Sequence, residues 1–297
     1  MRRKSVKVVL TAVLIASTLP GSAAGAAERN VIISALDAKK APVGDLTPGD
    51  LVVGEDGVAR EVLRVRRATA PLSIALLVDD SDAASPAIAD IRSGLEAFLG
   101  ALDAPHEVAL VTFGERSTLL VEYTRDRERL TRGALRVFAR PQSGAYFLDA
   151  LTDAARGLEK RAPERPVIVA VVTEGVEFSN RHYPDVLRQL FASGAAFHAL
   201  VLSGVVRANP VAEEIRNRNV VLDEGTRGTG GRRDQLLSST ALAATLRELA
   251  AELQHQWIVT YSRPDTLLMP ERLHVEAKRE GLTVRARTNL SQTKVAR

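Results

Sequence analysis

The 297-residue chain contains no cysteine and few aromatic residues, and these absences exclude several kinds of site. Without cysteine the protein has no disulfides, no catalytic thiol and no lipid attachment site at the cleavage point of a leader peptide. Phe, Trp and Tyr make up only 4% of the residues, too few for the stacking platform of a single-strand nucleic-acid binder. The five histidines show no paired spacing on one helix, and no Gly-x-Ser-x-Gly turn is present. A zinc site and a nucleophile-elbow hydrolase are therefore not expected.

Residues 1–26 have the three parts of a secretory signal peptide. Four basic residues come first, a short apolar run spans 8–19, and Ala24-Gly25-Ala26 supplies a small-x-small cleavage site. The apolar run is shorter than the roughly 20 residues that a membrane-spanning helix needs. We therefore expect a periplasmic or secreted protein with no stable membrane span after cleavage. An uncleaved amino-terminal anchor is the alternative.

The formal net charge of +4 comes from this same segment. Four of the 40 Lys and Arg residues and none of the 36 Asp and Glu residues lie within 1–26, which leaves 36 of each sign in the mature chain. A nucleic-acid binder carries a basic surface that this balance does not provide. No nucleic-acid partner is expected.

Between 70 and 253 the hydrophobic pattern alternates between strand and helix periods. Strand-like apolar runs lie at 72–78, 107–113, 117–123, 166–172 and 196–202. Helical apolar stripes lie at 85–102, 129–138, 147–158, 184–191 and 240–253. Strands that alternate with helices form mostly parallel sheets covered on both faces. The sequence therefore predicts a doubly wound α/β fold of Rossmann-like architecture, with a mostly parallel central sheet.

Small β extensions flank this domain at both ends. Residues 29–68 form an amino-terminal β unit, in which 51–53 and 62–67 read as a hairpin around the turn Glu55-Asp56-Gly57. Residues 255–290 contain three further strand-like runs separated by Pro and Gly turns. These last strands either extend the edge of the large sheet or join the amino-terminal β unit.

Acidic and hydroxyl residues follow two of the buried strands. Asp79-Asp80-Ser81-Asp82-Ala83 comes after the first strand of the sheet, and Thr173-Glu174-Gly175-Val176-Glu177 comes after the most apolar one. A tight loop that begins at Ser143 lies between them in sequence. In open α/β sheets ligands bind beyond the carboxyl ends of the strands, and oxygens of this kind are the ligands of hard cations.

Four segments in this order, LLVDDSD, SGAYFLDAL, VIVAVVTEG and GTGG, resemble the von Willebrand factor type A family, whose first strand ends in Asp-x-Ser-x-Ser. The flanks DAKKAPVGDLTPGDLVVGEDG, QWIVTYSRP and LTVRAR are similar to those of a bacterial group of exported type A-related proteins. The resemblance covers nearly the whole mature chain. It implies a type A domain over 70–253 that binds a protein or another ligand.

The resemblance also implies a metal-ion-dependent adhesion site, of which this chain keeps only part. Asp79 and Ser81 match the family's first Asp and first Ser, whereas Ala83 stands for the second Ser. Ala145 falls on the Thr of the middle loop, and Glu174 replaces the late Asp. Alanine offers no oxygen to an ion that demands near-octahedral geometry.

Other oxygens near these positions could complete the site. The candidates are Asp80, Asp82 and Ser143, which are also candidates for a binding face without metal. We expect either no cofactor or a weakly bound divalent cation such as Mg²⁺, Mn²⁺ or Ca²⁺. The favoured function is metal-independent, non-enzymatic binding of an unidentified protein partner.

The alternative function is a Mg²⁺-dependent phosphoryl-transfer or hydrolytic enzyme. In that interpretation Asp79 is the nucleophile, Glu174 holds the ion and Thr173 contacts phosphate. No lysine or arginine clamp stands beside these residues in the sequence. The glycine-rich stretch 225–231 lacks the P-loop lysine and follows no clear strand, so we expect a flexible loop there and no phosphate cradle.

Overall fold

The computed structural model describes residues 26–103, 105–203, 212–264 and 267–290. Its larger body contains a six-stranded sheet of order β10-β9-β8-β5-β6-β7. The strands are β5 (Leu72–Val78), β6 (Glu107–Thr112), β7 (Thr118–Thr124), β8 (Arg165–Thr173), β9 (Ala196–Leu202) and β10 (Arg233–Leu236). Neighbouring strands are parallel, except that β7 runs antiparallel to β6. The predicted α/β fold with a mostly parallel central sheet is confirmed.

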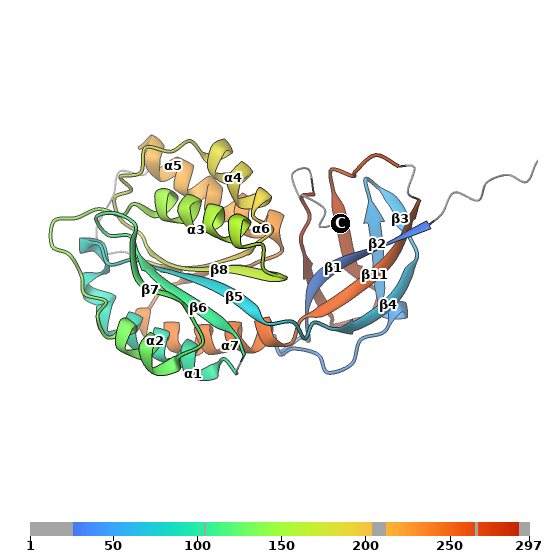
Figure 1. The fold of residues 1–297 in the computed structure, drawn as a ribbon, viewed down its shortest axis with the longest axis horizontal. Helices are drawn as coiled ribbons and strands as arrows, with labels where there is room; N and C mark the ends of the chain where they lie inside the picture. Colours follow the sequence, from blue (N-terminus) through green and yellow to red (C-terminus); the bar gives the residue numbers. More distant parts are fainter. Residues whose placement is uncertain (1–25, 104, 204–211, 265–266, 291–297) are drawn as a thin grey trace, which may run out of the picture.

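Helices cover both faces of this sheet (Figure 1). One face carries α1 (Ile88–Ala101), α2 (Arg127–Ala134) and α7 (Leu242–Gln254). The other face carries α3 (Phe147–Arg161), α4 (Tyr183–Ala192) and the helical segment that begins with α5 (Glu213–Val220). Adjacent side chains of β5 enter different cores, since Leu76 packs with the first layer and Leu77 with the second. The unbroken apolar run of this strand reflects burial on both faces.

The prediction of a flexible loop at 225–231 is wrong. The chain there continues α5 through a π-helical turn (Val221–Gly225) into α6 (Thr226–Thr229). A Cβ at Gly225 would lie 2.9 Å from Leu190, and one at Gly228 would lie 2.7 Å from Phe191. These glycines therefore allow the helical segment to pack closely on α4, and this packing accounts for the composition that suggested a loop.

The segments before and after the α/β body form a second body of two packed sheets (Figure 1). The sheets have the orders β13-β1-β11-β4 and β12-β2-β3. Their strands are β1 (Ala26–Leu36), β2 (Leu51–Glu55), β3 (Val58–Arg60), β4 (Val62–Arg67), β11 (Trp257–Pro264), β12 (Leu273–Ala277) and β13 (Thr283–Ala286). Buried side chains from both sheets, among them Ile33, Val53 and Trp257, share one core. The carboxyl-terminal strands thus join the amino-terminal β unit and do not extend the large sheet.

The predicted hairpin between 51–53 and 62–67 is wrong in its second strand. β2 turns at Asp56-Gly57, where both residues have positive φ, and pairs with the short strand β3. β4 crosses to the other sheet and pairs with β11. Both sheets bury one face in the same core, so the alternation of apolar residues in β4 is the same for either partner.

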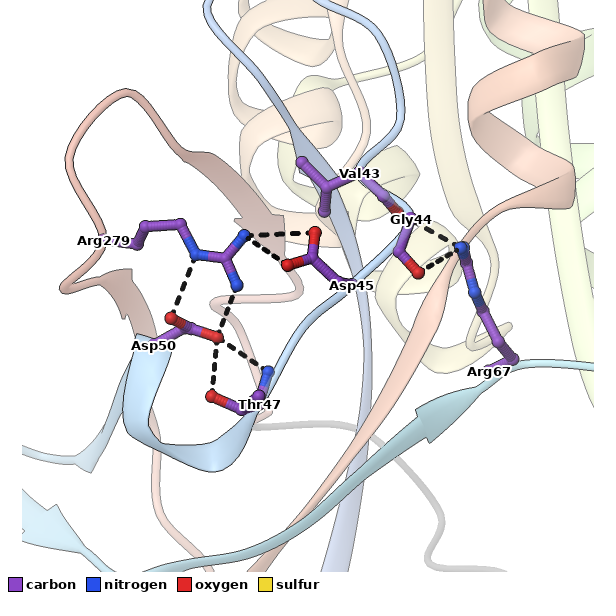
Figure 2. Close-up of polar contacts among 7 residues, drawn as sticks. All are labelled: Val43, Gly44, Asp45, Thr47, Asp50, Arg67 and Arg279. Carbon is purple, nitrogen blue, oxygen red and sulfur yellow. Dashed lines mark hydrogen bonds and ion pairs between the residues drawn. The ribbon is translucent and has the colours of Figure 1, made fainter.

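Two arginines from distant parts of the chain hold the irregular segment between β1 and β2 (Figure 2). Arg279, between β12 and β13, donates to both carboxylate oxygens of Asp50 at 3.0 and 2.7 Å and pairs with Asp45 at 3.3 Å. The Arg279 hydrogen bonds hold the pKa of Asp50 well below its usual range. Arg67 of β4 donates to the backbone carbonyls of residues 43–44. Arg279 thereby joins the carboxyl-terminal part of this body to its amino-terminal part.

The chain crosses between the two bodies twice, at 68–71 and at 253–256. Arg165, at the start of β8, is 3% exposed and donates to backbone carbonyls of both crossings. A second link joins Arg285 of β13 to the buried carboxylate of Glu252 in α7, at 2.5 Å. The two bodies therefore share buried polar contacts as well as two connections.

Among the described residues, no helix is long and apolar enough to span a membrane. The predicted signal peptide covers 1–26, and residues 1–25 lie outside the described part of the chain. Export stays a prediction of the sequence.

Candidate functional site

Asp79 lies at the carboxyl end of β5 in the middle of the large sheet, and its side chain is completely buried. One carboxylate oxygen accepts a hydrogen bond from the backbone N–H of Ser81, and the other accepts from that of Thr173, each at 2.9 Å. Burial raises the pKa of Asp79, and the hydrogen bonds from Ser81 and Thr173 oppose that rise. Asp79 therefore ties the end of β5 to the end of β8.

Asp80 serves a different pair of loops. Its carboxylate accepts from the backbone N–H of Gly114 at 2.6 Å and from the guanidinium of Arg140 at 2.9 Å. Arg140 also pairs with Glu115 at 3.0 Å. A Cβ at position 114 would lie 2.5 Å from the Asp80 backbone, so only glycine fits there. Asp80 thus binds both the loop that follows β6 and the loop that follows α2.

Asp82 and Ser143, two further residues of the predicted site, contact each other through their backbones. The Asp82 side chain is exposed, and its backbone N–H donates to the carbonyl of Ser143 at 3.3 Å. The Ser143 hydroxyl donates to a backbone carbonyl at 2.9 Å. Ala83 and Ala145 are buried, and a Cβ at Gly175 would lie 2.6 Å from the Ala83 methyl. The loops after β5 and β8 are therefore packed directly against each other.

Glu174 is directed away from Asp79. Its carboxylate accepts from the side-chain amide of Gln235 at 3.0 Å, and Gln235 lies on β10. Glu174 follows β8, and in the strand order β10 lies on one side of β8 while β5, which ends before Asp79, lies on the other. The Glu174 side chain therefore points toward β10 and away from Asp79. Mg²⁺ requires near-octahedral oxygens, and these residues do not fit it. Among the described residues, no group of three or more His, Cys, Asp or Glu side chains is placed to hold a metal ion.

A short bridge joins the loop of Ala145 to the segment after β8. The Ala145 N–H donates to the carbonyl of Val176 at 2.9 Å, and the Phe178 N–H donates to the carbonyl of Ala145 at 2.7 Å. A Cβ at Gly144 would lie 2.5 Å from the Phe178 ring, so the loop passes the ring closely. The bridge holds both segments in one conformation at the edge of the sheet.

Two further buried charges lie at this edge. Glu177 is 2% exposed, and one of its oxygens has no hydrogen-bond partner. Arg218 of α5 is 4% exposed and donates to the carbonyl of Gly175 at 2.9 Å. Burial raises the pKa of Glu177 to about 7, and a local hydrogen bond and the charge of Arg218 oppose the rise. Burial lowers the pKa of Arg218, and the charges of Glu177, Asp79 and Glu174 oppose the fall.

No protein-family model and no curated protein matches the chain. A solved structure described as von Willebrand factor type A from Catenulispora acidiphila is similar over 94% of this chain and 76% of its own, with 10% sequence identity and a TM-score of 0.51. The chain has a von Willebrand factor type A fold. The match covers more residues of this chain than the six-stranded body contains. The similarity therefore extends into the β body.

Two other solved structures are similar to the chain at lower TM-scores. The von Willebrand factor domain of the type V pili tip protein Mfa5 from Porphyromonas gingivalis is 11% identical and matches 62% of this chain and 95% of its own, with a TM-score of 0.47. The conserved hypothetical protein BatB from Bacteroides thetaiotaomicron is 12% identical and matches 61% of this chain and 98% of its own, with a TM-score of 0.45. At such identities the likeness describes the fold alone.

The carboxyl edge of the type A sheet exposes apolar side chains beside the buried acids. Val176 is 40% exposed and Phe178 is 51% exposed. The Tyr146 ring meets the Phe178 ring edge to face, with centroids 6.0 Å apart. We call Tyr146, Val176 and Phe178 the Phe178 patch. Two of its members belong to the bridge that fixes this edge.

Sequence reasoning placed the acids at this edge and missed Phe178 and Arg218. Phe178 carried a usable signal, because it is one of seven phenylalanines and stands in a polar segment just after the most apolar strand. Arg218 carried none, since no helix was predicted over 213–229 and its side chain could not be assigned to a face.

Proposed function

We propose that this protein is a non-enzymatic, extracytoplasmic binding module that holds a protein partner at the carboxyl edge of its type A sheet without a metal ion. The observation that carries the proposal is the Phe178 patch. The half-exposed ring of Phe178 on a fixed backbone is the kind of aromatic anchor that dominates protein interfaces. The bridge through Ala145 provides that fixed backbone. The type A fold supports the same role by analogy, because its loops are displayed on a rigid sheet.

Metal independence is supported by the donor geometry. Both oxygens of Asp79 are bound to backbone N–H groups, and Glu174 is engaged by Gln235. The same geometry disfavours the enzymatic alternative, because a nucleophilic Asp79 needs an oxygen that substrate can reach. Its side chain is 0% exposed. The extracytoplasmic location rests on the signal-like residues 1–26.

The test is capture of the partner by immobilised mature protein from a cell-envelope extract that contains chelator. Phe178→Ser should weaken capture about 30-fold, because loss of an aromatic anchor typically costs about 2 kcal/mol of binding free energy. The matched control is Leu268→Ser, which removes a 93% exposed leucine from the β body and should leave capture unchanged. Equal melting temperatures would verify that both variants are folded.

Two results would contradict the proposal. One is a captured protein that both variants retain equally, because the patch would then play no part in binding. The other is a partner that binds only when Mg²⁺, Mn²⁺ or Ca²⁺ replaces the chelator.

A further inference from the structure

Three exposed apolar side chains stand next to one another in sequence between β11 and β12 of the β body. Leu267 is 43% exposed, Leu268 is 93% exposed and Met269 is 48% exposed. Consecutive exposed apolar residues are unfavourable for a protein in water unless they serve a contact. We call these three residues the Leu268 tip.

A buried arginine holds the backbone of the Leu268 tip. Arg263 of β11 is 2% exposed, and it donates to the backbone carbonyl of Leu267 at 3.0 Å and to that of Leu268. Its guanidinium also pairs with Glu55 at 3.1 Å, and Glu55 accepts from the Tyr261 hydroxyl at 2.8 Å. The backbone of the tip is therefore fastened to the interior of the β body, while its side chains stay exposed.

The segment that follows the tip is fixed as well. The backbone N–H groups of Glu271 and Arg272 donate to the carboxylate of Asp56, at 3.2 and 2.9 Å. A surface that is ordered beforehand loses less conformational entropy when it binds. These contacts therefore prepare the tip for a contact outside the β body.

The amino-terminal segment enters the β body beside the tip. Ala26, the first residue of β1, pairs with Pro264 at the end of β11. The segment before Ala26 contains four basic residues followed by the apolar run 8–19. Residues 20–25 can extend over at most about 20 Å. A membrane that receives the apolar run during export would therefore lie within reach of the tip.

The tip and the Phe178 patch lie at opposite ends of the protein. β5 and β11 each begin directly after a crossing between the bodies, where the Ala68 N–H donates to the carbonyl of Gln256 at 2.9 Å. From there β5 runs through the type A body to Asp79, and β11 runs the other way through the β body (Figure 1). A contact at the tip therefore leaves the Phe178 patch uncovered.

We propose that the Leu268 tip inserts its side chains into the surface of a lipid bilayer and orients the protein with the Phe178 patch away from the membrane. The tip carries no aromatic ring, whereas aromatic and arginine side chains dominate contacts between proteins. Aliphatic side chains at the boundary between head groups and acyl chains are stabilised by the apolar area that they bury. The inference shares with the proposed function only the predicted export of the chain.

The absence of cysteine allows a single probe to be placed at the tip. Leu268→Cys, labelled with nitrobenzoxadiazole, is reconstituted as the full chain in vesicles of phosphatidylethanolamine and phosphatidylglycerol. The emission should shift to the blue, and lipid with a spin label near the head group should quench most of it. Leu237→Cys is the matched control, because Leu237 is 89% exposed on the type A body and its label should remain in water.

Further variants separate insertion from mere proximity to the bilayer. Leu267→Ser with Met269→Ser should restore most of the emission at position 268, because these side chains help to hold the tip in lipid. Unchanged quenching in that variant would overturn the proposal, since the tip would then be near the bilayer by attachment alone. Equal quenching at position 237, or a full chain that does not bind vesicles, would also overturn it.

A second copy of the chain is the other occupant that the probe would reveal. A blue shift without lipid that grows with protein concentration would assign the tip to contact between copies and overturn the proposal. Analytical ultracentrifugation of the labelled mature protein measures the same association directly, and it should show no dependence on the residues of the tip.

These outcomes are distinct from a failure of the proposed function. Phe178→Ser should leave the quenching at position 268 unchanged, and Leu268→Ser should leave partner capture unchanged. Loss of the lipid contact would remove the orientation and leave binding through Phe178 intact. Capture that survives Phe178→Ser would remove the patch from binding and leave the lipid contact intact.

Discussion

His198 gives a quantitative prediction for acid stability. It lies in β9, is completely buried, and has no hydrogen-bond partner at either ring nitrogen. Burial lowers its pKa to about 4, while the charge of Glu252 raises it and those of Arg285 and Arg232 lower it. In the unfolded chain the imidazole has its ordinary pKa of about 6.5. Below that pH the unfolded chain binds a proton that the folded protein does not bind.

The sign and size of the effect follow from this difference. Stability is fully present above pH 6.5, begins to fall below it, and the loss is complete near pH 4. A gap of about 2.5 pKa units corresponds to about 3 kcal/mol of unfolding free energy. Urea unfolding between pH 7.5 and 4 should show this loss in the wild-type protein.

His198→Leu separates this contribution from the titration of the carboxylates. At pH 7.5 the variant should be at least as stable as wild type, because leucine has a similar volume and removes two unpartnered polar atoms. By pH 4 it should be more stable by a further margin of about 3 kcal/mol. His274→Gln, on an exposed strand position, should follow wild type throughout. Parallel loss of stability in wild type and His198→Leu would refute the reasoning.

Two substitutions test the contacts between the bodies. Gly230→Ala should lower the unfolding free energy by about 2 kcal/mol or more, because φ is +80° and a Cβ would lie 2.5 Å from the Ala286 backbone. Its control is Gly100→Ala in α1, where an added Cβ would meet no atom within 4 Å. In the same urea titration this variant should have an unfolding free energy about 0.5–1 kcal/mol higher than wild type. Arg165→Met should lower the unfolding free energy by about 3 kcal/mol, because it leaves two buried carbonyls and one part-buried carbonyl at the crossings without a donor. Limited proteolysis should then cut the crossings faster than in wild type, and an unchanged digestion pattern would show that Arg165 does not hold them.

The sheet and most helices of the type A body were predictable because each carries its own periodicity. The run Leu72–Val78 is apolar throughout, as burial on both faces requires, and the helix from Phe147 keeps a clear stripe. The helical segment 213–229 was not predictable in this way. Its glycines weaken local helix propensity, and its stability comes from contact with α4, which lies far away in sequence.

The β body was predictable as strands but not as pairings. The alternating residues of 62–67 identify a strand with one buried face. Nothing in them distinguishes pairing with β2 from pairing with β11, because both pairings bury the same side chains in one core. The close sequence neighbour was the natural expectation, and the distant strand is the actual partner.

The site was predictable in its location and not in its connections. Strand ends place Asp79 and Glu174 at the same edge of the sheet from sequence alone. Which group binds each carboxylate depends on segments that fold in from elsewhere, such as Gln235 for Glu174. Arg218 reaches this edge only because an unexpected helix passes it. Ligand sets inferred from spacing therefore need the direction of each side chain before they describe a site.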